Sequence, residues 1–130
     1  MRFGEDFGWW PDPAAVAAVW YLNGGYIIDE VTYGNYLDND FLARAISDYQ
    51  TIHRANALVV ADASEPKSIE AQRKHKLRVE GSERGKDSVE YRIKVVSGLK
   101  ISVTRRSENI WKDYEIYAMA EDKEGNPKGY

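Results

Sequence analysis

Two aspartates, Asp6 and Asp62, each follow a short segment that reads as a strand. Asp62 ends the run Ala-Leu-Val-Val-Ala, the most apolar strand in the chain, and Asp6 lies between Gly4 and Gly8. In an open α/β sheet, polar groups at the carboxyl ends of central strands point into the crevice where ligands bind. If these two strands are neighbours, the carboxylates face each other, and a shared divalent cation is the natural way to keep both ionised. Two metals bridging such carboxylates and a phosphodiester can activate water and stabilise the leaving oxygen.

A simpler interpretation of each aspartate stays open. Asp62 precedes Ser64-Glu65-Pro66, which reads as a helix start with proline in the first turn, so its carboxylate also suits a helix cap. Asp6 also suits a turn after the first strand. The matched position of the two residues in one topology favours the metal-binding interpretation without settling it.

The elements expected along the chain place both aspartates in a mixed sheet. Two runs of strand-forming residues flank Asn23-Gly24-Gly25, which is a strong hairpin signal. Further strands are expected over 57–61, 77–79 and 100–104, and helices over 38–54 and from Ser64, Asp87 and Ser107. This order predicts an α/β fold in which three antiparallel strands are followed by parallel strands, with helices on both faces of the sheet.

Length and composition exclude several classes of protein. The 130 residues suit a single domain, 1–130, with one core. The absence of cysteine excludes a disulfide framework and a thiolate zinc site. No apolar run reaches the ~20 residues of a membrane span, and neither a secretory leader nor a Walker-type phosphate loop is present. We therefore expect a cytosolic protein with no membrane partner that is not itself a nucleotide-driven motor.

The charge is distributed unevenly. Residues 1–65 contain 3 Lys/Arg and 10 Asp/Glu, whereas residues 66–106 contain 12 Lys/Arg and 5 Asp/Glu. An acidic first half and a basic middle would suit an enzyme that holds metal with carboxylates and phosphate with cations. A solvated surface that happens to segregate charge explains the same counts equally well.

Four stretches together carry a resemblance to a known family. The segment Val60 to Ile69, Val-Ala-Asp-Ala-Ser-Glu-Pro-Lys-Ser-Ile, is similar to the second acidic motif of the large subunit of tailed-phage terminases, which cut concatemeric DNA and package it. Gly-Glu-Asp-Phe-Gly at 4–8, followed by Asp-Pro-Ala-Ala at 12–15, resembles the opening of that family's nuclease domain. The stretches 85–89 and 122–126 are similar to later parts of it, in the same order.

The resemblance implies an RNase H-like nuclease domain that cuts double-stranded DNA with Mg²⁺ or Mn²⁺ at a two-metal site. Asp6 and Asp62 match the first two metal ligands of the family. The third family ligand lies in a final helix, and the chain stops at Tyr130 before any such stretch, so we expect a domain that lacks its last segment. Glu65 is the nearest spare carboxylate and is expected to act as a helix cap or behind the ligands.

Other residues have weaker assignments. Lys67, Arg84 and Lys86 are expected to contact DNA phosphates, with Arg73 and Lys74 as further candidates, although an exposed basic face is an equally good interpretation. His53 and His75 are read as surface or helix-end residues. The side chains of Trp9 and Trp10 are expected to pack in the core and against the hairpin, with a base-stacking platform as the alternative.

Two functional hypotheses follow. The first is the metal-dependent endonuclease domain of a phage terminase, which would act in the host cytoplasm and transiently at the procapsid, with the ATPase domain, the small terminase subunit and the portal as partners. The second is an inactive remnant or docking module with the same fold, favoured by the missing third acid. Another RNase H-like enzyme, such as a resolvase or transposase, is a third and weaker possibility.

Overall fold

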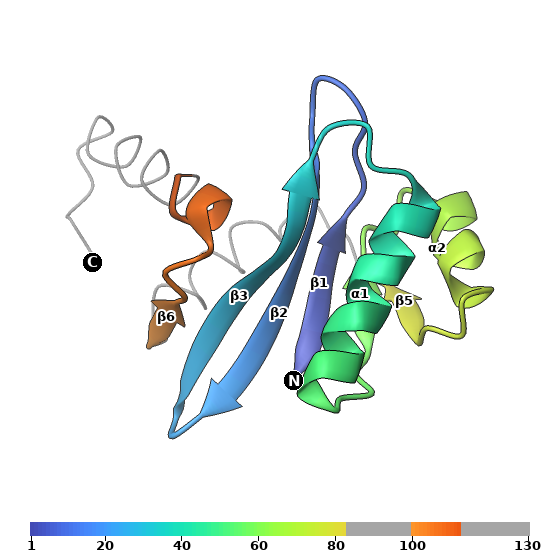
Figure 1. Ribbon diagram of the computed structural model, residues 1–130. Helices are drawn as coiled ribbons and strands as arrows, with labels where there is room; N and C mark the ends of the chain where they lie inside the picture. Colours follow the sequence, from blue (N-terminus) through green and yellow to red (C-terminus); the bar gives the residue numbers. More distant parts are fainter. Residues whose placement is uncertain (83–99, 113–130) are drawn as a thin grey trace.

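Six strands and two helices make up the part of the chain that the structure, a computed structural model, describes, which is residues 1–82 and 100–112. The strands are β1 (Arg2–Asp6), β2 (Ala14–Leu22), β3 (Gly25–Gly34), β4 (Val59–Ala61), β5 (Val79–Gly81) and β6 (Ile101–Val103). The helices are α1 (Asn39–His53) and α2 (Pro66–Arg73), and a further helical turn spans 108–112. Figure 1 shows the sheet with α1 crossing in front of it.

The sheet is mixed, as the element order predicts. Its strand order is β5-β4-β1-β2-β3-β6. The pairs β1–β2 and β2–β3 are antiparallel, whereas β1–β4, β4–β5 and β3–β6 are parallel. The expectation of three antiparallel strands followed by parallel ones is confirmed. The predicted strand at 77–79 was placed two residues too early, since β5 begins at Val79.

The hairpin between β2 and β3 forms where the sequence predicts it. Asn23 and Gly24 are the two connecting residues, with φ angles of 51° and 77°. A two-residue connection with positive φ at both positions matches the right-handed twist of the flanking strands, and asparagine followed by glycine tolerates these angles best. The turn therefore fixes the register that aligns β2 with β3.

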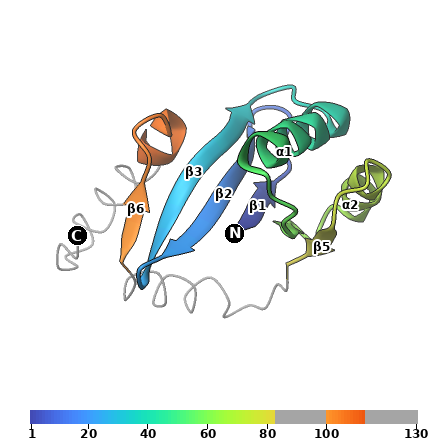
Figure 2. The same ribbon diagram turned by 60° about the horizontal axis from the view of Figure 1, so that its bottom comes forward.

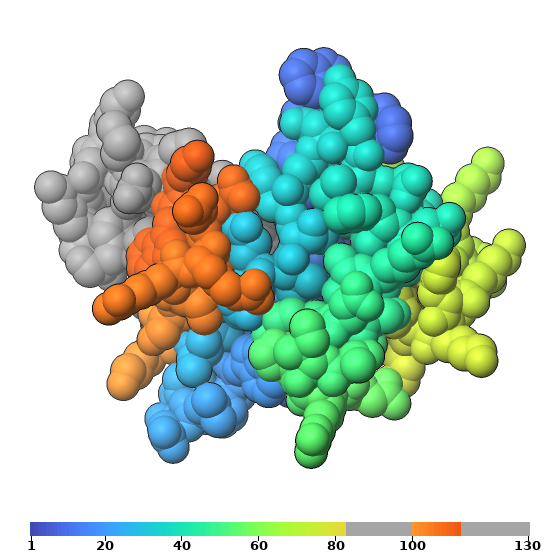
Figure 3. Space-filling view, viewed as in Figure 1, coloured from blue at the N-terminus to red at the C-terminus, as the bar shows by residue number. Residues whose placement is uncertain are grey.

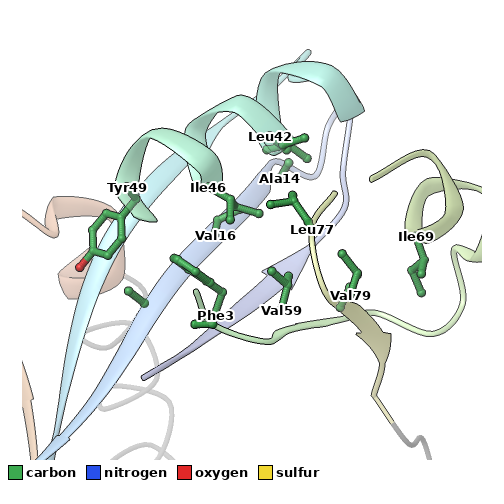
Figure 4. Close-up of a cluster of buried hydrophobic side chains, with 14 residues drawn as sticks. Phe3, Ala14, Val16, Leu42, Ile46, Tyr49, Val59, Ile69, Leu77 and Val79 are labelled. Carbon is green, nitrogen blue, oxygen red and sulfur yellow. The ribbon is translucent and has the colours of Figure 1, made fainter. Parts of the chain in front are cut away.

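Helix α1 follows the predicted boundaries and covers one face of the sheet. Asp38 caps its first turn, accepting a hydrogen bond from the N–H of Phe41 (2.8 Å), and Arg54 ends it in the left-handed conformation. Its buried residues are Leu42, Ala43, Ile46 and Tyr49, whereas the apolar side chains of Phe41 and Ile52 are exposed. The buried face of α1 belongs to the core shown in Figure 4, to which the strands, α2 and the segment before β5 also contribute: Phe3, Ala14, Val16, Leu42, Ile46, Tyr49, Val59, Ile69, Leu77 and Val79.

Helices α1 and α2 pack against each other and lie on the same side of the sheet (Figure 2). The turn at 108–112 reaches the other face, where Ile110 lies over the small residues Gly4, Ala15 and Ala17. The helix expected from Asp87 and most of the loop expected at 81–86 lie outside the described residues. Within residues 1–82 and 100–112, no helix is long and apolar enough to cross a bilayer.

Candidate metal centre

Asp6 and Asp62 lie at the ends of neighbouring parallel strands. The register of β1 and β4 pairs Glu5 with Ala61, one residue before each aspartate, and the N–H of Asp62 donates to the carbonyl oxygen of Glu5 (3.2 Å). Neighbouring strands lie about 4.8 Å apart. Glu5 is buried on the α1 side, so the alternation of β1 directs Asp6 to the opposite face, and Asp62 is the first residue after β4. The expected juxtaposition of the first and fourth strands is confirmed.

The connection from β4 to α2 is organised around Asp62. Its Oδ1 accepts a hydrogen bond from the N–H of Ser64 (2.9 Å), and its carbonyl accepts one from the N–H of Glu65 (3.3 Å). The N-cap position of α2 is occupied by Glu65, which is exposed and whose side chain makes no capping hydrogen bond. Asp62 is therefore not the cap of α2, although its carboxylate does hold the turn that leads into the helix.

An open cavity of about 300 Å³ lies beside Asp6, on the face opposite α1. Its floor is made of small residues, Gly4, Ala15 and Ala17, and its rim includes Asp6 and Ile110. A Cβ added at Gly4 would meet nothing within 4 Å, so this part of the sheet surface is open to approach. A ligand bound beside the two aspartates would have room on this side.

A buried acid and amide lie directly beneath the site. Glu5 and Gln72 are 6% and 0% exposed, and Gln72 Nε2 donates to Glu5 Oε2 (2.6 Å). Burial raises the pKa of Glu5 to about 7, against the smaller opposite effect of the hydrogen bond from Gln72. In the described part of the chain, Oε1 of each side chain has no hydrogen-bond partner. A protonated Glu5 can donate to Gln72 Oε1 and complete a two-bond pair that ties β1 to α2.

We predict that the Glu5 carboxyl makes folding stability depend on pH. A carboxyl whose pKa is higher in the folded state binds more protons when folded, so its contribution is fully present below the ordinary value of 4.5 and is lost as pH rises through about 7. Glu5→Gln keeps the neutral hydrogen-bonding pattern and should flatten this slope. Urea unfolding from pH 5 to pH 8 measures it, and equal slopes for both proteins would contradict the assignment.

A second buried carboxylate joins β3 to the segment after β6. Asp29, 6% exposed, accepts hydrogen bonds from Tyr49 (2.8 Å), from Thr104 (2.6 Å) and from two nitrogens of Arg106 (2.8 and 2.6 Å). Burial alone would raise its pKa, but the hydrogen bonds from Arg106, Thr104 and Tyr49 and the charge of Arg106 outweigh burial and lower the pKa to about 2. Its role was not predicted from the sequence, because Asp29 lies 77 positions from Arg106.

Glu30, the next residue, anchors the helical turn at 108–112. Its carboxylate accepts hydrogen bonds from the backbone N–H groups of Asn109 (3.0 Å) and Ile110 (3.1 Å), and its own N–H donates to Ser107 Oγ (2.8 Å). A carboxylate at a helix N-terminus satisfies backbone donors and complements the helix dipole. The predicted helix start at Ser107 is confirmed, although its partner on β3 was not foreseen.

The structure describes some of the other residues singled out from the sequence, and the rest lie in segments that it does not describe. Lys67 is exposed on α2, whereas Arg73 donates twice to the carbonyl of Val79 and so has a structural contact. Arg84 and Lys86 lie outside the described residues. His53, the last residue of α1, and His75, which contacts Asp40 (2.8 Å), are both exposed, as expected.

The prediction that Trp9 and Trp10 pack in the core is wrong. They are 55% and 64% exposed on the loop between β1 and β2. Hydrophobic character alone does not place a residue inside, because a loop at the sheet edge has no layer above it.

Within residues 1–82 and 100–112, no group of three or more His, Asp or Glu side chains could hold a metal. Within these residues, the structure therefore adds no third acid or histidine to the site expected at Asp6 and Asp62.

Comparison with known proteins identifies the class of the fold and then the family. No family model matches the chain. The structure superposes on the crystal structure of the large terminase nuclease domain from bacteriophage SPP1, solved with bound Mn, with a TM-score of 0.74 and 29% identity over 88% of this chain and 66% of that one. The fold is therefore the RNase H-like fold of a large-terminase nuclease domain, which confirms the expected fold class.

The amino-acid sequence leads to the same family. The chain is 33% identical to the terminase large subunit of Bacillus phage SPP1 over 135 aligned positions, which cover 98% of this chain and 31% of that protein. The chain is a homologue of the terminase large subunit and corresponds to its nuclease domain. It spans about a third of the length of that relative.

Proposed function

We propose that this chain is the divalent-metal-dependent endonuclease domain of a phage DNA-packaging terminase and cleaves double-stranded concatemeric DNA. The observation that supports the proposal is that β1 and β4 are neighbouring parallel strands, with Asp6 at the end of one and Asp62 directly after the other. The likeness to a nuclease domain that was solved with bound Mn supports the same assignment.

The residues present fit a hard divalent cation. Carboxylate oxygens are the ligands that Mg²⁺ and Mn²⁺ prefer, and two carboxylates on adjacent strands repel each other unless a cation lies between them. Asp6 and Asp62 would hold the metal, and the cavity beside Asp6 leaves space for a phosphodiester. When bound, one or two such ions supply water activation and stabilisation of the leaving oxygen.

The protein groups around the pair have positioning roles. The N–H of Ser64 orients the Asp62 carboxylate, and the Glu5–Gln72 pair holds the end of β1 against α2. Glu65, the N-cap residue of α2, would act behind the ligands. Hydrolysis of this kind needs no nucleophilic side chain, which agrees with a sequence that contains no cysteine.

DNA would be held by the basic middle of the chain. Lys67 is exposed on α2, the helix that follows Asp62, and the sequence places Arg84 and Lys86 further along the same basic stretch. Contacts of this kind are to phosphates and carry little sequence preference. Within a full terminase, the partners would be the ATPase domain, the small terminase subunit and the portal, in the host cytoplasm and at the procapsid.

A second candidate function is a domain that keeps the fold and binds DNA or the portal without cutting. It is favoured by one observation: in the described part of the chain, no group of three or more histidine or acidic side chains could hold a metal.

Plasmid nicking separates the two candidates. The endonuclease should convert supercoiled plasmid into open circles in Mn²⁺ or Mg²⁺ and leave it intact in EDTA. A folded protein that binds Mn²⁺ but leaves the plasmid supercoiled would support the docking module. Nicking that persists in EDTA would contradict metal-dependent cleavage.

A further inference from the structure

Three aromatic side chains gather on the surface at the edge of the sheet where β1 ends. Trp9 and Trp10 belong to the loop after β1, and Tyr36 belongs to the connection from β3 to α1; they are 55%, 64% and 58% exposed. The Trp10 and Tyr36 rings are stacked, with 5.7 Å between centroids and 4° between planes, and the Trp9 ring meets Tyr36 edge-on at 5.5 Å. We call these three residues the aromatic cluster. In Figure 3 the loop after β1 protrudes in blue at the top of the molecule.

Hydrogen bonds between the two loops hold the aromatic cluster in place. Asn35 Nδ2 donates to the carbonyls of Trp9 (3.1 Å) and Pro11 (3.0 Å). The N–H of Tyr36 donates to the same Trp9 carbonyl (3.1 Å), and the N–H of Trp9 donates to the carbonyl of Asp12 (2.9 Å). A surface that is already ordered loses little conformational entropy when a partner binds. The exposed rings are therefore presented in a fixed arrangement.

Exposed, contiguous aromatic surface of this kind is typical of binding sites. Tryptophan and tyrosine are enriched among the residues that dominate protein interfaces, because each buries a large area with few rotatable bonds. Soluble proteins rarely leave such side chains grouped on the surface without a partner. The aromatic cluster does not contribute to the core cluster, so packing of the sheet does not explain it.

The charge around the aromatic cluster selects the kind of partner. Residues 3–43 contain no lysine or arginine, and the exposed acids of this stretch include Asp40 at the start of α1. Asp12 and Asp38, in the same two loops as the rings, are exposed. A DNA backbone would be repelled here, since binding to nucleic acid depends on cations that meet the phosphates. Cationic side chains would be attracted both by the carboxylates and by the faces of the rings.

We propose that the aromatic cluster is a docking surface for a protein segment that carries arginine or lysine side chains. The cationic groups lie over the exposed rings, and Asp12 and Asp38 neutralise them. This function is separate from DNA cleavage and holds whether or not the chain is a nuclease. Because the cluster follows β1 by three residues, the partner would bind close to Asp6.

The test uses the indole N–H signals of the four tryptophans, observed by NMR on the whole chain. A peptide of alternating arginine and glycine should shift the Trp9 and Trp10 signals saturably. Those of Trp20 and Trp111, whose indoles donate within the fold to Tyr49 and Thr104, should stay in place. A matched peptide of glutamate and glycine should shift none of them. Equal shifts with both peptides would overturn the proposal.

Variants supply a second, independent readout. Trp10→Ala should weaken binding of the arginine peptide about 2- to 5-fold, because it removes one ring face from beneath a cationic group. The separate variant Asp12→Asn should also weaken binding of this peptide in low salt. Tyr21→Ala is the matched control, because Tyr21 is equally exposed (62%) and paired with Tyr26, but lies beside the hairpin turn between β2 and β3. Unchanged affinity in Trp10→Ala, or binding of oligothymidylate that disappears in Trp10→Ala, would overturn a cationic protein partner.

Discussion

Replacing Asp6 with alanine is expected to slow Mn²⁺-dependent plasmid nicking by about 10³-fold or more, since bound metal supplies several kcal/mol of transition-state stabilisation. The fold should survive the change. Asp6 is exposed at the last position of β1, and its backbone pairing with β2 does not depend on the side chain. Nicking of supercoiled plasmid at fixed Mn²⁺ gives the rate, and urea unfolding gives the stability.

Asp62→Ala should produce a similar loss of nicking, with a small additional loss of stability of about 1 kcal/mol from the missing hydrogen bond to Ser64. Asp48→Ala is the matched control, because Asp48 is an exposed aspartate of α1. It should nick plasmid at the wild-type rate. Wild-type rates from both purified Asp6 and Asp62 variants would remove these residues from the metal centre.

Asp29→Ala is expected to cost about 3 kcal/mol of folding stability, because it leaves buried polar partners without an acceptor. The Asp29 carboxylate accepts hydrogen bonds from Tyr49, Thr104 and Arg106 and so fastens the segment after β6 to β3 and α1. The loss should appear as a lower midpoint of urea unfolding at pH 7. Nicking per folded molecule should change little, since Asp29 lies on the α1 face of the sheet, away from Asp6.

Two comparisons sharpen this prediction. Arg106→Ala should cost less, about 1 kcal/mol, because the Arg106 side chain is 60% exposed, so solvent screens its pairing with Asp29, and Asp29 keeps the hydrogen bonds from Tyr49 and Thr104. The pKa of Asp29 is lower in the folded state, about 2, so its contribution is present above the ordinary value of 3.8 and is lost as pH falls toward 2. Asp29→Ala should flatten the acid limb of the stability curve. A loss below about 0.5 kcal/mol, typical of surface sites, would contradict a structural role.

Features with a local signal could be predicted from the sequence. Asn23-Gly24 specifies its turn by backbone preference alone, and Asp38 marks the start of α1 because its side chain caps residues close in the chain. Asp62 stands out because it ends the most apolar strand. The element order predicts that the strand after α1 lies parallel to another strand of the sheet, but the pairing of β4 with β1 itself was only a condition until the structure showed it.

Features that depend on partners distant in the sequence could not be predicted. Gln72 meets Glu5 across 67 positions, and no pattern near either residue shows that the two face each other. The alternation of β1 could have indicated that Glu5 shares the buried face with Phe3, but not what would pair with it. Trp9 and Trp10 were placed wrongly for a related reason, since residue type does not show whether a loop has a layer above it.

Mn²⁺ binding tests most directly whether Asp6 and Asp62 form a metal centre, and it does not require the chain to be active. Titration followed by the paramagnetic resonance of free Mn²⁺ gives the Kd for wild type, Asp6→Ala, Asp62→Ala and Asp48→Ala. We expect saturable binding in wild type and in Asp48→Ala, weakened about 10-fold or more in the other two, by analogy with the 10- to 100-fold cost of losing even an outer-shell partner. The same Kd in all four proteins would contradict a metal centre at these strand ends.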